Sequence, residues 1–361
     1  MLEFQVTRSN LHQFRLIETD ALSPIQNGEV LVRIERFSFT ANNITYGVAG
    51  DQLGYWHFFP PHGEDTSEQG ILPVWGFAEV IESKSDELPI GDRLYGYFPP
   101  AEKLKMRPTN VSKGQFIDGS EHRSKLPPGY NVYRRVEAEP GYNRAIDNHR
   151  ALLFPLHVTS FCLWDSLQNK DWHNAEQVLV LSASSKTSLG LGFALKEDTN
   201  APHSIGLTSA RNAGFVESTN YFDQTLTYDQ LEKIDKSKPT VIVDMSGNGD
   251  LLGKLHKALG DNLMHCINVG MTHWDEGVQN KDINAEKSEF FFAPGHIQKR
   301  LKDWGPQGFA EKSGSFLMKS AQASATWLKV KEVEGLAELE TYYPQILDGK
   351  FAPEEGLIIK L

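Results

Sequence analysis

The sequence predicts an α/β protein in which a β-rich module is followed by a parallel sheet with crossover helices. Up to Pro99 the chain consists mainly of short alternating segments separated by turn residues, which is typical of a compact β-barrel-like module. From Gln177 onwards, solid apolar runs alternate with apolar residues at helical spacing. This alternation indicates a parallel sheet with right-handed crossovers, whose ligand crevice lies at the C-terminal ends of the strands. At 361 residues the chain is long enough for two domains.

Strands of the N-terminal module are predicted at Val30–Phe37, Ala78–Ser83 and Arg93–Phe98, each bounded by turn residues. From residue 101 to 150 the composition shifts to Pro, Gly, Lys, Arg and Glu with little periodicity, which predicts an irregular connection. Apolar residues at helical spacing over His149–Gln168, interrupted by a proline, predict one helix or two short ones.

Buried strands of the second half are predicted at Gln177–Leu181, Ser204–Thr208, Thr240–Met245 and His265–Val269. A helix is predicted over Leu189–Lys196, and another begins near Asn248 with leucines on one face.

The charge balance argues against nucleic-acid and membrane partners. Acidic residues number 47 and basic residues 36, and the net charge of -11 repels phosphate backbones and anionic lipid surfaces. No stretch approaches the about 18 apolar residues of a membrane span, and charged residues interrupt any signal-like segment near the N-terminus. The two cysteines, Cys162 and Cys266, fit neither a disulfide scaffold nor a zinc lobe. We therefore expect a cytoplasmic protein that acts on a small molecule.

The turn after the first buried strand is the main candidate for ligand binding. It reads Ser182-Ala183-Ser184-Ser185-Lys186-Thr187-Ser188-Leu189-Gly190. Dinucleotide-binding units carry glycines here, so that the backbone approaches the pyrophosphate at the helix N-terminus. Small side chains still permit that approach, hydroxyls add donors, and Lys186 adds a positive charge. Ser184, Ser185, Lys186 and Thr187 are therefore predicted to hold an anion; the alternative is an ordinary serine-capped helix.

The end of the second buried strand bears on the choice of coenzyme. NAD sites usually place an acidic residue there to accept from the ribose 2′-OH, whereas NADP sites place hydroxyl and basic residues. This chain has Thr208-Ser209-Ala210-Arg211. If a dinucleotide binds, we expect NADP(H), with its extra phosphate on Ser209 and Arg211; the alternative is an exposed basic turn.

Several short motifs occur in order along nearly the whole chain. Gly28–Ile34 looks like an opening strand, Gly76–Val80 like a Gly-x-x-x-Val strand, and Gly91–Gly96 like a GDRV-x-G motif. Val178–Lys196 aligns without a gap on a stretch usually written VLV-x-A-A-x-G-G-V-G, and Asp244–Gly247 resembles a D-x-x-G strand end. Together they resemble the medium-chain dehydrogenase/reductase superfamily, in particular its zinc-independent quinone oxidoreductase and enoyl reductase branches.

This resemblance implies a GroES-like β-barrel domain over residues 1–150 and a Rossmann domain, a doubly wound parallel sheet, over residues 151–295. Residues 296–361 would form a C-terminal segment that returns to the first domain. The resemblance also implies that Phe292 passes near the nicotinamide, and that the strand ends contact the coenzyme through Ser246, Gly247, Gly270 and Met271. Because most relatives are dimers or tetramers, it implies a homodimer.

The chain departs from the superfamily at its metal and phosphate sites. Asn42-Asn43 stands near the position of the first zinc-ligand cysteine, no Gly-His-Glu motif occurs, and no cysteine precedes Cys162, so we expect no zinc. His57 and His62 lack a carboxylate framework that would complete a metal site. Both glycines of the phosphate loop are replaced, by Ser185 and Ser188. The resulting Ser-Ser-Lys-Thr sequence resembles an uncharacterised bacterial branch of the superfamily, so dinucleotide binding is either retained in altered form or lost.

Reduction without zinc needs a donor that polarises a carbonyl group and a proton source for the enolate. In the enoyl reductase relatives a tyrosine in the loop after the second strand can serve as that donor. Tyr46 is the candidate here, with Asn42 or Asn43 as its hydrogen-bonding partner; the alternative is that Tyr46 packs on Trp56 and Phe58.

The leading hypothesis is an NADPH-dependent, zinc-free reductase of an activated double bond or carbonyl, as in enones, quinones or enoyl thioesters. The rival hypothesis is a redox-inactive member of the superfamily that binds another anion or a partner protein. The substitutions at Ser185, Lys186 and Ser188 motivate that rival. A serine hydrolase is disfavoured because no Gly-x-Ser-x-Gly elbow is present.

Overall fold

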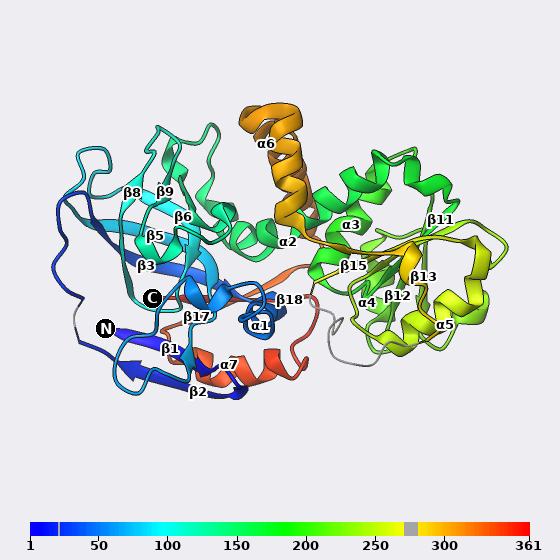
Figure 1. Ribbon diagram of the computed structural model, residues 1–361, viewed down its shortest axis with the longest axis horizontal. Coiled ribbons are helices and arrows are strands. Elements are labelled where there is room, and N and C mark those ends of the chain that lie inside the picture. The colour runs from blue at the N-terminus through cyan, green and yellow to red at the C-terminus, as the bar shows by residue number, and fades with distance from the viewer. Residues whose placement is uncertain (21, 271–280) are drawn as a thin grey trace. The chain divides into compact units, whose positions relative to one another are not determined.

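The computed structural model describes residues 1–20, 22–270 and 281–361 (Figure 1). The described residues divide into two compact units. Unit 1 comprises Met1–Leu152 and Leu328–Leu361, and unit 2 comprises Leu153–Trp327. One unit is built on a mixed sheet and the other on a parallel sheet, which confirms the predicted α/β class.

Unit 1 contains a larger sheet with the strand order β17-β18-β3-β5-β6-β10-β9-β8, in which β7 pairs with β3, and a smaller sheet with the order β2-β1-β4. Its strands are β1 (Leu2–Thr7), β2 (Asn10–Glu18), β3 (Val30–Phe39), β4 (Gln69–Gly70), β5 (Val74–Ser83), β6 (Arg93–Phe98), β7 (Lys103–Met106), β8 (Pro108–Thr109), β9 (Gln115–Asp118), β10 (Val132–Arg135), β17 (Lys329–Glu334) and β18 (Glu355–Lys360). Its helices include α1 (Ala41–Val48), η1 (Tyr55–His57), η3 (Pro128–Asn131) and α7 (Glu338–Leu347).

The three strands predicted from alternation lie within β3, β5 and β6. The prediction of an irregular stretch over residues 101–150 was wrong in part, because β7 to β10 lie there. These strands are two to four residues long, which is too short for a period of two to stand out. The proline at position 155 does not end the helix: α2 runs without a break over Asp147–Gln168.

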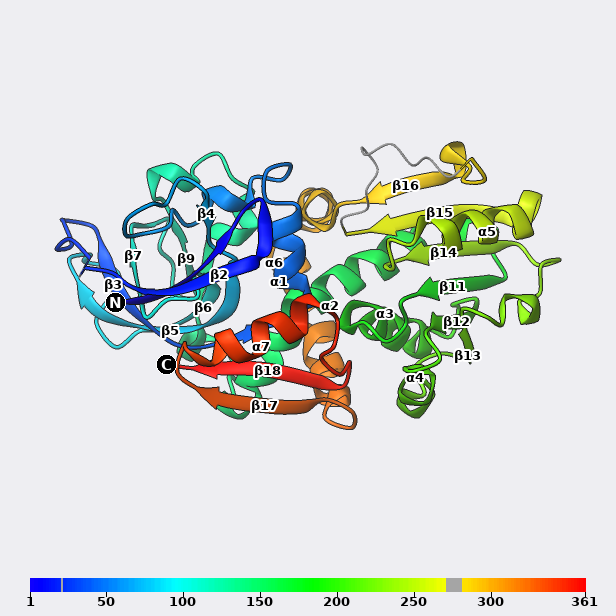
Figure 2. The same ribbon diagram turned by 90° about the horizontal axis from the view of Figure 1, so that it is seen from below.

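Unit 2 is built on a parallel sheet with the strand order β13-β12-β11-β14-β15-β16, which Figure 2 shows side by side. The strands are β11 (Gln177–Leu181), β12 (His203–Thr208), β13 (Gln224–Thr227), β14 (Thr240–Asp244), β15 (Leu263–Val269) and β16 (Ser288–Phe291). The helices include α3 (Lys186–Glu197), α4 (Ala213–Thr219), α5 (Gly249–Leu259) and α6 (Ala293–Ser324). Numbered along the chain, this order is 3-2-1-4-5-6, the doubly wound arrangement that reverses direction between its first and fourth strands.

The two strands at that reversal consist mainly of apolar residues because both of their faces are covered. Every residue of β11 and β14 is buried, and Leu179, Leu181 and Ile242 belong to the hydrophobic core of unit 2. The turn after β11 therefore sits where the crevice of such a sheet opens, at the carboxyl ends of the strands.

Residues 296–327 belong to unit 2, and the chain enters unit 1 again at Leu328. These residues belong to unit 2 because α6 packs on α2. The ring of Phe161 lies 6.2 Å from that of Phe309 and 5.7 Å from that of Phe316. Asp165 of α2 also accepts hydrogen bonds from His296 at 2.6 Å and from Arg300 at 2.5 Å.

Within the described ranges, none of the helices combines the length and the apolar character needed to cross a bilayer.

The start of α3 lies against α2 at a glycine. A Cβ atom on Gly190 would approach Ser160 Oγ to 2.5 Å and His157 Cδ2 to 2.7 Å. These distances are too short for any real contact, so a larger residue would force the two helices apart.

We expect Gly190→Ala to lower the free energy of unfolding by about 1–3 kcal/mol, because the added methyl group overpacks the contact between α2 and α3. Gly214→Ala is the matched control, since a Cβ at that exposed helical position meets nothing within 4 Å. It should stabilise the protein by about 0.5–1 kcal/mol. Urea unfolding of both variants measures the difference, and equal effects would contradict the close approach.

Candidate functional site

The turn between β11 and α3 begins in a conformation that usually needs glycine. Ser182 has a φ angle of +56°, in the left-handed region. Its N–H donates to the hydroxyl of Tyr228 at 3.2 Å, and the N–H of Ser185 donates to its carbonyl at 2.8 Å. The backbone thus makes the sharp reversal expected of a phosphate-binding turn, although it carries serines.

The serines that replace the two family glycines bind each other. Ser185 is the N-cap of α3: its Oγ accepts from the N–H of Ser188 at 3.2 Å and donates to Ser188 Oγ at 2.9 Å. Ser188 is fully buried, and its Oγ lies 3.0 Å from Met245 Sδ, just beyond β14. These hydroxyls therefore cap the helix and join neighbouring strand ends, rather than pointing as donors into open space.

Ser184 links this turn to the end of β12. Its buried Oγ accepts from Asn212 Nδ2 at 3.0 Å and from Thr208 Oγ1 at 3.3 Å. Ser209 is half-buried and Arg211 is exposed in the short connection that follows β12. The residues predicted to bind the diphosphate therefore follow β11, and those predicted to bind the 2′-phosphate follow β12, the neighbouring strand of the same parallel sheet.

Helix α2 contacts the first turn of α3. Ser160 Oγ donates to the carbonyl of Thr187 at 2.7 Å, and His157 Nδ1 lies 2.9 Å from Ser320 Oγ of α6. Burial is the main cause that lowers the pKa of His157 to about 4; a hydrogen bond with the backbone of Lys186 opposes this decrease, and the charge of Lys186 adds to it. The imidazole is therefore neutral at pH 7 and leaves Lys186 as the cation at this turn.

The predicted coenzyme residues after β14, β15 and β16 differ in their surroundings. Ser246 Oγ donates to Asp244 Oδ1 at 2.6 Å, so the proton of this hydroxyl is already used in a hydrogen bond to the last residue of β14. Gly247 and Gly270 both have positive φ angles, +63° and +82°, and lie just after β14 and β15. Phe292 follows β16 and is partly exposed, whereas Met271 lies outside the described residues.

In unit 1, Tyr46 lies on α1 and is almost completely buried. Its hydroxyl accepts from Trp75 Nε1 at 3.2 Å, and the side chain of Asn42 also hydrogen-bonds to it. Burial raises the pKa of Tyr46, and these two hydrogen bonds offset part of that increase. The phenol is therefore protonated at pH 7.

Asn43 has a structural role in the same helix. Its Oδ1 accepts from the N–H of Thr40 at 2.7 Å, and its Nδ2 donates to the carbonyl of Pro73 at 2.7 Å. Thr40 and Asn43 form the reciprocal capping arrangement that starts α1. The Thr-x-x-Asn spacing was the sequence signal for this role, and it leaves Asn42 as the partner of Tyr46.

Three other tyrosine rings pack around Tyr46. Ring centroids lie at 4.7 Å for Tyr55, 5.4 Å for Tyr97 and 6.2 Å for Tyr130. We call these four residues the tyrosine cluster. Trp56, one of the expected packing partners, lies instead under the backbone of Gly50 and Gly70.

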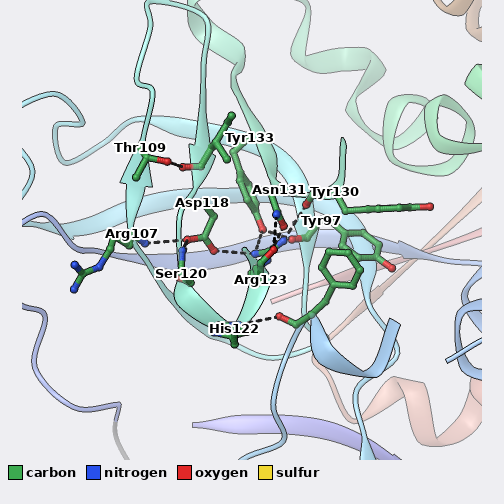
Figure 3. Close-up of polar contacts among 12 residues, drawn as sticks. Tyr97, Arg107, Thr109, Asp118, Ser120, His122, Arg123, Tyr130, Asn131 and Tyr133 are labelled. Carbon is green, nitrogen blue, oxygen red and sulfur yellow. Dashed lines mark hydrogen bonds and ion pairs between the residues drawn. The ribbon is translucent and has the colours of Figure 1, made fainter. Parts of the chain in front are cut away.

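Sequence reasoning missed the buried arginine that supports this cluster. Figure 3 shows Arg123 surrounded by polar groups: Nη1 donates to Asp118 at 2.8 Å, Nε to Asn131 at 2.9 Å and Nη2 to the carbonyl of Tyr130 at 2.9 Å. Arg123 is only 1% exposed. It lies in the stretch without periodicity, where nothing in the pattern separates a buried arginine from a solvated one.

The two histidines considered for a metal have separate surroundings. His62 Nδ1 lies 2.7 Å from a carboxylate oxygen of the buried Glu3, and no contact joins it to His57 among the interactions of the described residues. In the ranges that the structure describes, no three His, Cys, Asp or Glu side chains are arranged to hold a metal ion.

Comparison with known proteins places the chain in a family and a fold. Residues 37–352 match the family described as protein of unknown function (DUF2855). A search of the curated proteins finds no match to this chain.

Solved structures match over the full length. CurA from Vibrio vulnificus in complex with NADPH is 14% identical, with a TM-score of 0.64 and coverage of 100% of this chain and 99% of that chain. The quinone oxidoreductase from Coxiella burnetii is 15% identical, with a TM-score of 0.57 and the same coverage. A mycobacterial protein complexed with NADPH is 12% identical, with a TM-score of 0.58 and coverage of 100% of both chains. These likenesses confirm the predicted fold, a GroES-like β-barrel domain plus a Rossmann domain.

Proposed function

The chain belongs to the family described as protein of unknown function (DUF2855), and we propose that it is an NADPH-dependent, zinc-free reductase. The substrates we propose are activated double bonds or carbonyl groups, as in enones, quinones or enoyl thioesters. The observation that carries this proposal is the 3-2-1-4-5-6 strand order with Ser209 and Arg211, and no carboxylate, after β12. Two of the solved structures that share the fold are described as NADPH complexes, which supports the choice of coenzyme.

The donor set at the strand ends suits a phosphorylated coenzyme. Lys186 and Thr187 in the first turn of α3 would hold the diphosphate, together with the helix N-terminus. Ser209 and Arg211 would hold the 2′-phosphate, and the turns at Gly247 and Gly270 would allow close backbone approach. When bound, NADPH supplies a hydride to the substrate.

Tyr46 supplies the proton in this scheme. The phenol is protonated at pH 7 and can donate to a substrate oxygen, which polarises the carbonyl group. The hydrogen bonds from Trp75 and Asn42 then stabilise the oxygen that has lost its proton. Asn42 is therefore the proposed partner of Tyr46, and Asn43 holds the helix that carries both.

One observation favours the rival function, a redox-inactive protein that binds another anion or a partner protein. Ser185 and Ser188 bind each other and Met245, so they use hydroxyls that a diphosphate would otherwise meet. In that case Lys186 would serve a smaller anion or a partner's carboxylate.

We also propose that the protein forms a homodimer through β16. Among the described strands, β16 pairs only with β15, so no described strand pairs with its other edge. Phe290 on β16 is 48% exposed, and Phe292 next to it is 37% exposed. An open edge with exposed aromatic side chains is suited to pairing with a second copy.

The coenzyme is tested by calorimetric titration with NADPH and NADH. We expect NADPH to bind more tightly, and Arg211→Gln to weaken NADPH about 10-fold or more while leaving NADH unchanged, since a charge-assisted bond to the 2′-phosphate is lost. Arg33→Gln, an exposed arginine of β3, is the control. If neither nucleotide binds below millimolar concentration, the reductase proposal fails.

The double variant Ser185→Gly/Ser188→Gly separates the two functions. The rival function predicts that these glycines create dinucleotide affinity that the parent protein lacks, because they free the turn. An affinity that stays unchanged in the same titration counts against the rival.

The homodimer is tested by light scattering coupled to size exclusion. We expect Phe290→Lys to halve the measured mass, because a buried charge at the strand edge opposes pairing. Ile90→Lys is the matched control, since Ile90 is 65% exposed on unit 1. A wild-type mass equal to one chain would contradict the proposal.

A further inference from the structure

Met245 follows β14 directly, and its thioether lies against the start of α3. Strand β14 pairs in parallel with β11, so the end of β14 lies beside the turn that leads into α3 (Figure 2). The sulfur of Met245 accepts a hydrogen bond from Ser188 Oγ at 3.0 Å, and Ser188 belongs to the first turn of α3. A thioether therefore takes part in the polar contacts of the candidate coenzyme turn.

The hydroxyl of Ser188 depends on this sulfur. Ser188 is fully buried, and its Oγ reaches two acceptors, the sulfur and the carbonyl of Leu181 at 3.3 Å. The carbonyl contact is long, and a thioether is a weak acceptor. The same Oγ accepts from the N-cap residue Ser185 at 2.9 Å. A change at the sulfur is therefore transmitted to the N-cap of α3 through one hydroxyl group.

Met245 is also accessible to small molecules. It is partly exposed, whereas Ser188 beneath it is buried. A thioether sulfur carries two lone pairs, and the hydroxyl of Ser188 engages one of them. By contrast, Met106 is 1% exposed in the core of unit 1 and is shielded there. Met318 of α6 is partly exposed as well, which makes it a comparison for Met245.

Oxidation of this sulfur would alter the turn. Sulfur and hydroxyl oxygen are in direct contact at 3.0 Å, so an oxygen atom bound to the sulfur does not fit between them. If the added oxygen points toward Ser188, it displaces the hydroxyl. If it points away, the sulfur becomes positively polarised and no longer accepts a hydrogen bond. In both cases Ser188 loses its bond to the sulfur, and the N-cap contact that depends on Ser188 is loosened.

We propose that Met245 is a site of reversible oxidation whose sulfoxide weakens coenzyme binding at the turn between β11 and α3. The effect on the coenzyme rests on the proposed reductase function, whereas the oxidation itself does not. The oxidant is a hydroperoxide: its O–O bond breaks, an S–O bond forms, and the sulfur loses the two electrons that reduce the peroxide to an alcohol or water. Methionine sulfoxide reductases, with thiols as the reductant, remove the oxygen as water and restore the thioether.

The first experiment treats the full chain with hydrogen peroxide and then titrates it calorimetrically with NADPH. We expect peptide mass spectrometry to find one added oxygen on Met245. We expect the Kd for NADPH to rise about 10-fold, because a coenzyme that binds a loosened turn must also order it. Treatment with methionine sulfoxide reductases A and B should return the Kd to its original value.

Two variants locate the effect. Met245→Leu keeps a similar apolar volume without an oxidisable sulfur, so peroxide should leave its Kd for NADPH unchanged. Met318→Leu is the matched control and should remain as sensitive to peroxide as the wild type. The proposal is overturned if Met318 takes up oxygen while Met245 does not, or if peroxide still weakens NADPH binding to the Met245→Leu protein.

The second experiment needs no coenzyme. The N–H of Ser188 donates to Ser185 Oγ at 3.2 Å, so its hydrogen exchange reports on the N-cap. We expect oxidation of Met245 to speed this exchange about 10-fold, while the amides of α4 stay unchanged. An equal exchange rate before and after oxidation contradicts the inference and leaves the reductase proposal standing. If NADPH binds neither form, the reductase proposal fails, and the exchange rates still decide whether Met245 controls the turn.

Discussion

The pairing of β11 with β12 on one side and β14 on the other is the constraint on which the coenzyme site depends. Helices cross over to opposite faces of the sheet from this point, so the turn after β11 is left at the crevice. The apolar runs Val178–Leu181 of β11 and Val241–Val243 of β14 secure the arrangement, because every residue of both strands is buried. Everything proposed for Lys186, Ser209 and Arg211 follows from that placement.

Much of unit 2 could be predicted from the sequence because its signals are strong and local. A buried parallel strand is a continuous apolar run, which predicts β11, and the alternation of strands with helices that follows predicts β12, β14 and β15. By contrast, β16 and β13 are four residues long, and β16 has a mixed burial pattern, so no window contained enough of either to reveal it. The same limit hid the short strands of unit 1.

The candidate site in unit 1 shows a different limit. Tyr46 could be selected because the enoyl reductase relatives can place a donor tyrosine in the loop after the second strand, but its neighbours come from segments far along the chain. Tyr130 and Arg123 lie in a stretch rich in proline, glycine and charge, where composition predicts solvent exposure. Only the closure of the sheet around β6 and β10 brings that stretch inward, and periodicity carries no information about such contacts.

The serine pair at the start of α3 has a thermodynamic consequence. A turn of glycines is loosely ordered until an anion satisfies its amides, so part of the binding energy is consumed in freezing it. Here the hydroxyls of Ser185 and Ser188 already hydrogen-bond to each other, and Ser185 Oγ also accepts from the N–H of Ser188 at the start of the helix. An anion that reaches this corner meets a preformed surface, so its association should lose little chain entropy and should show the small heat-capacity change of a rigid receptor.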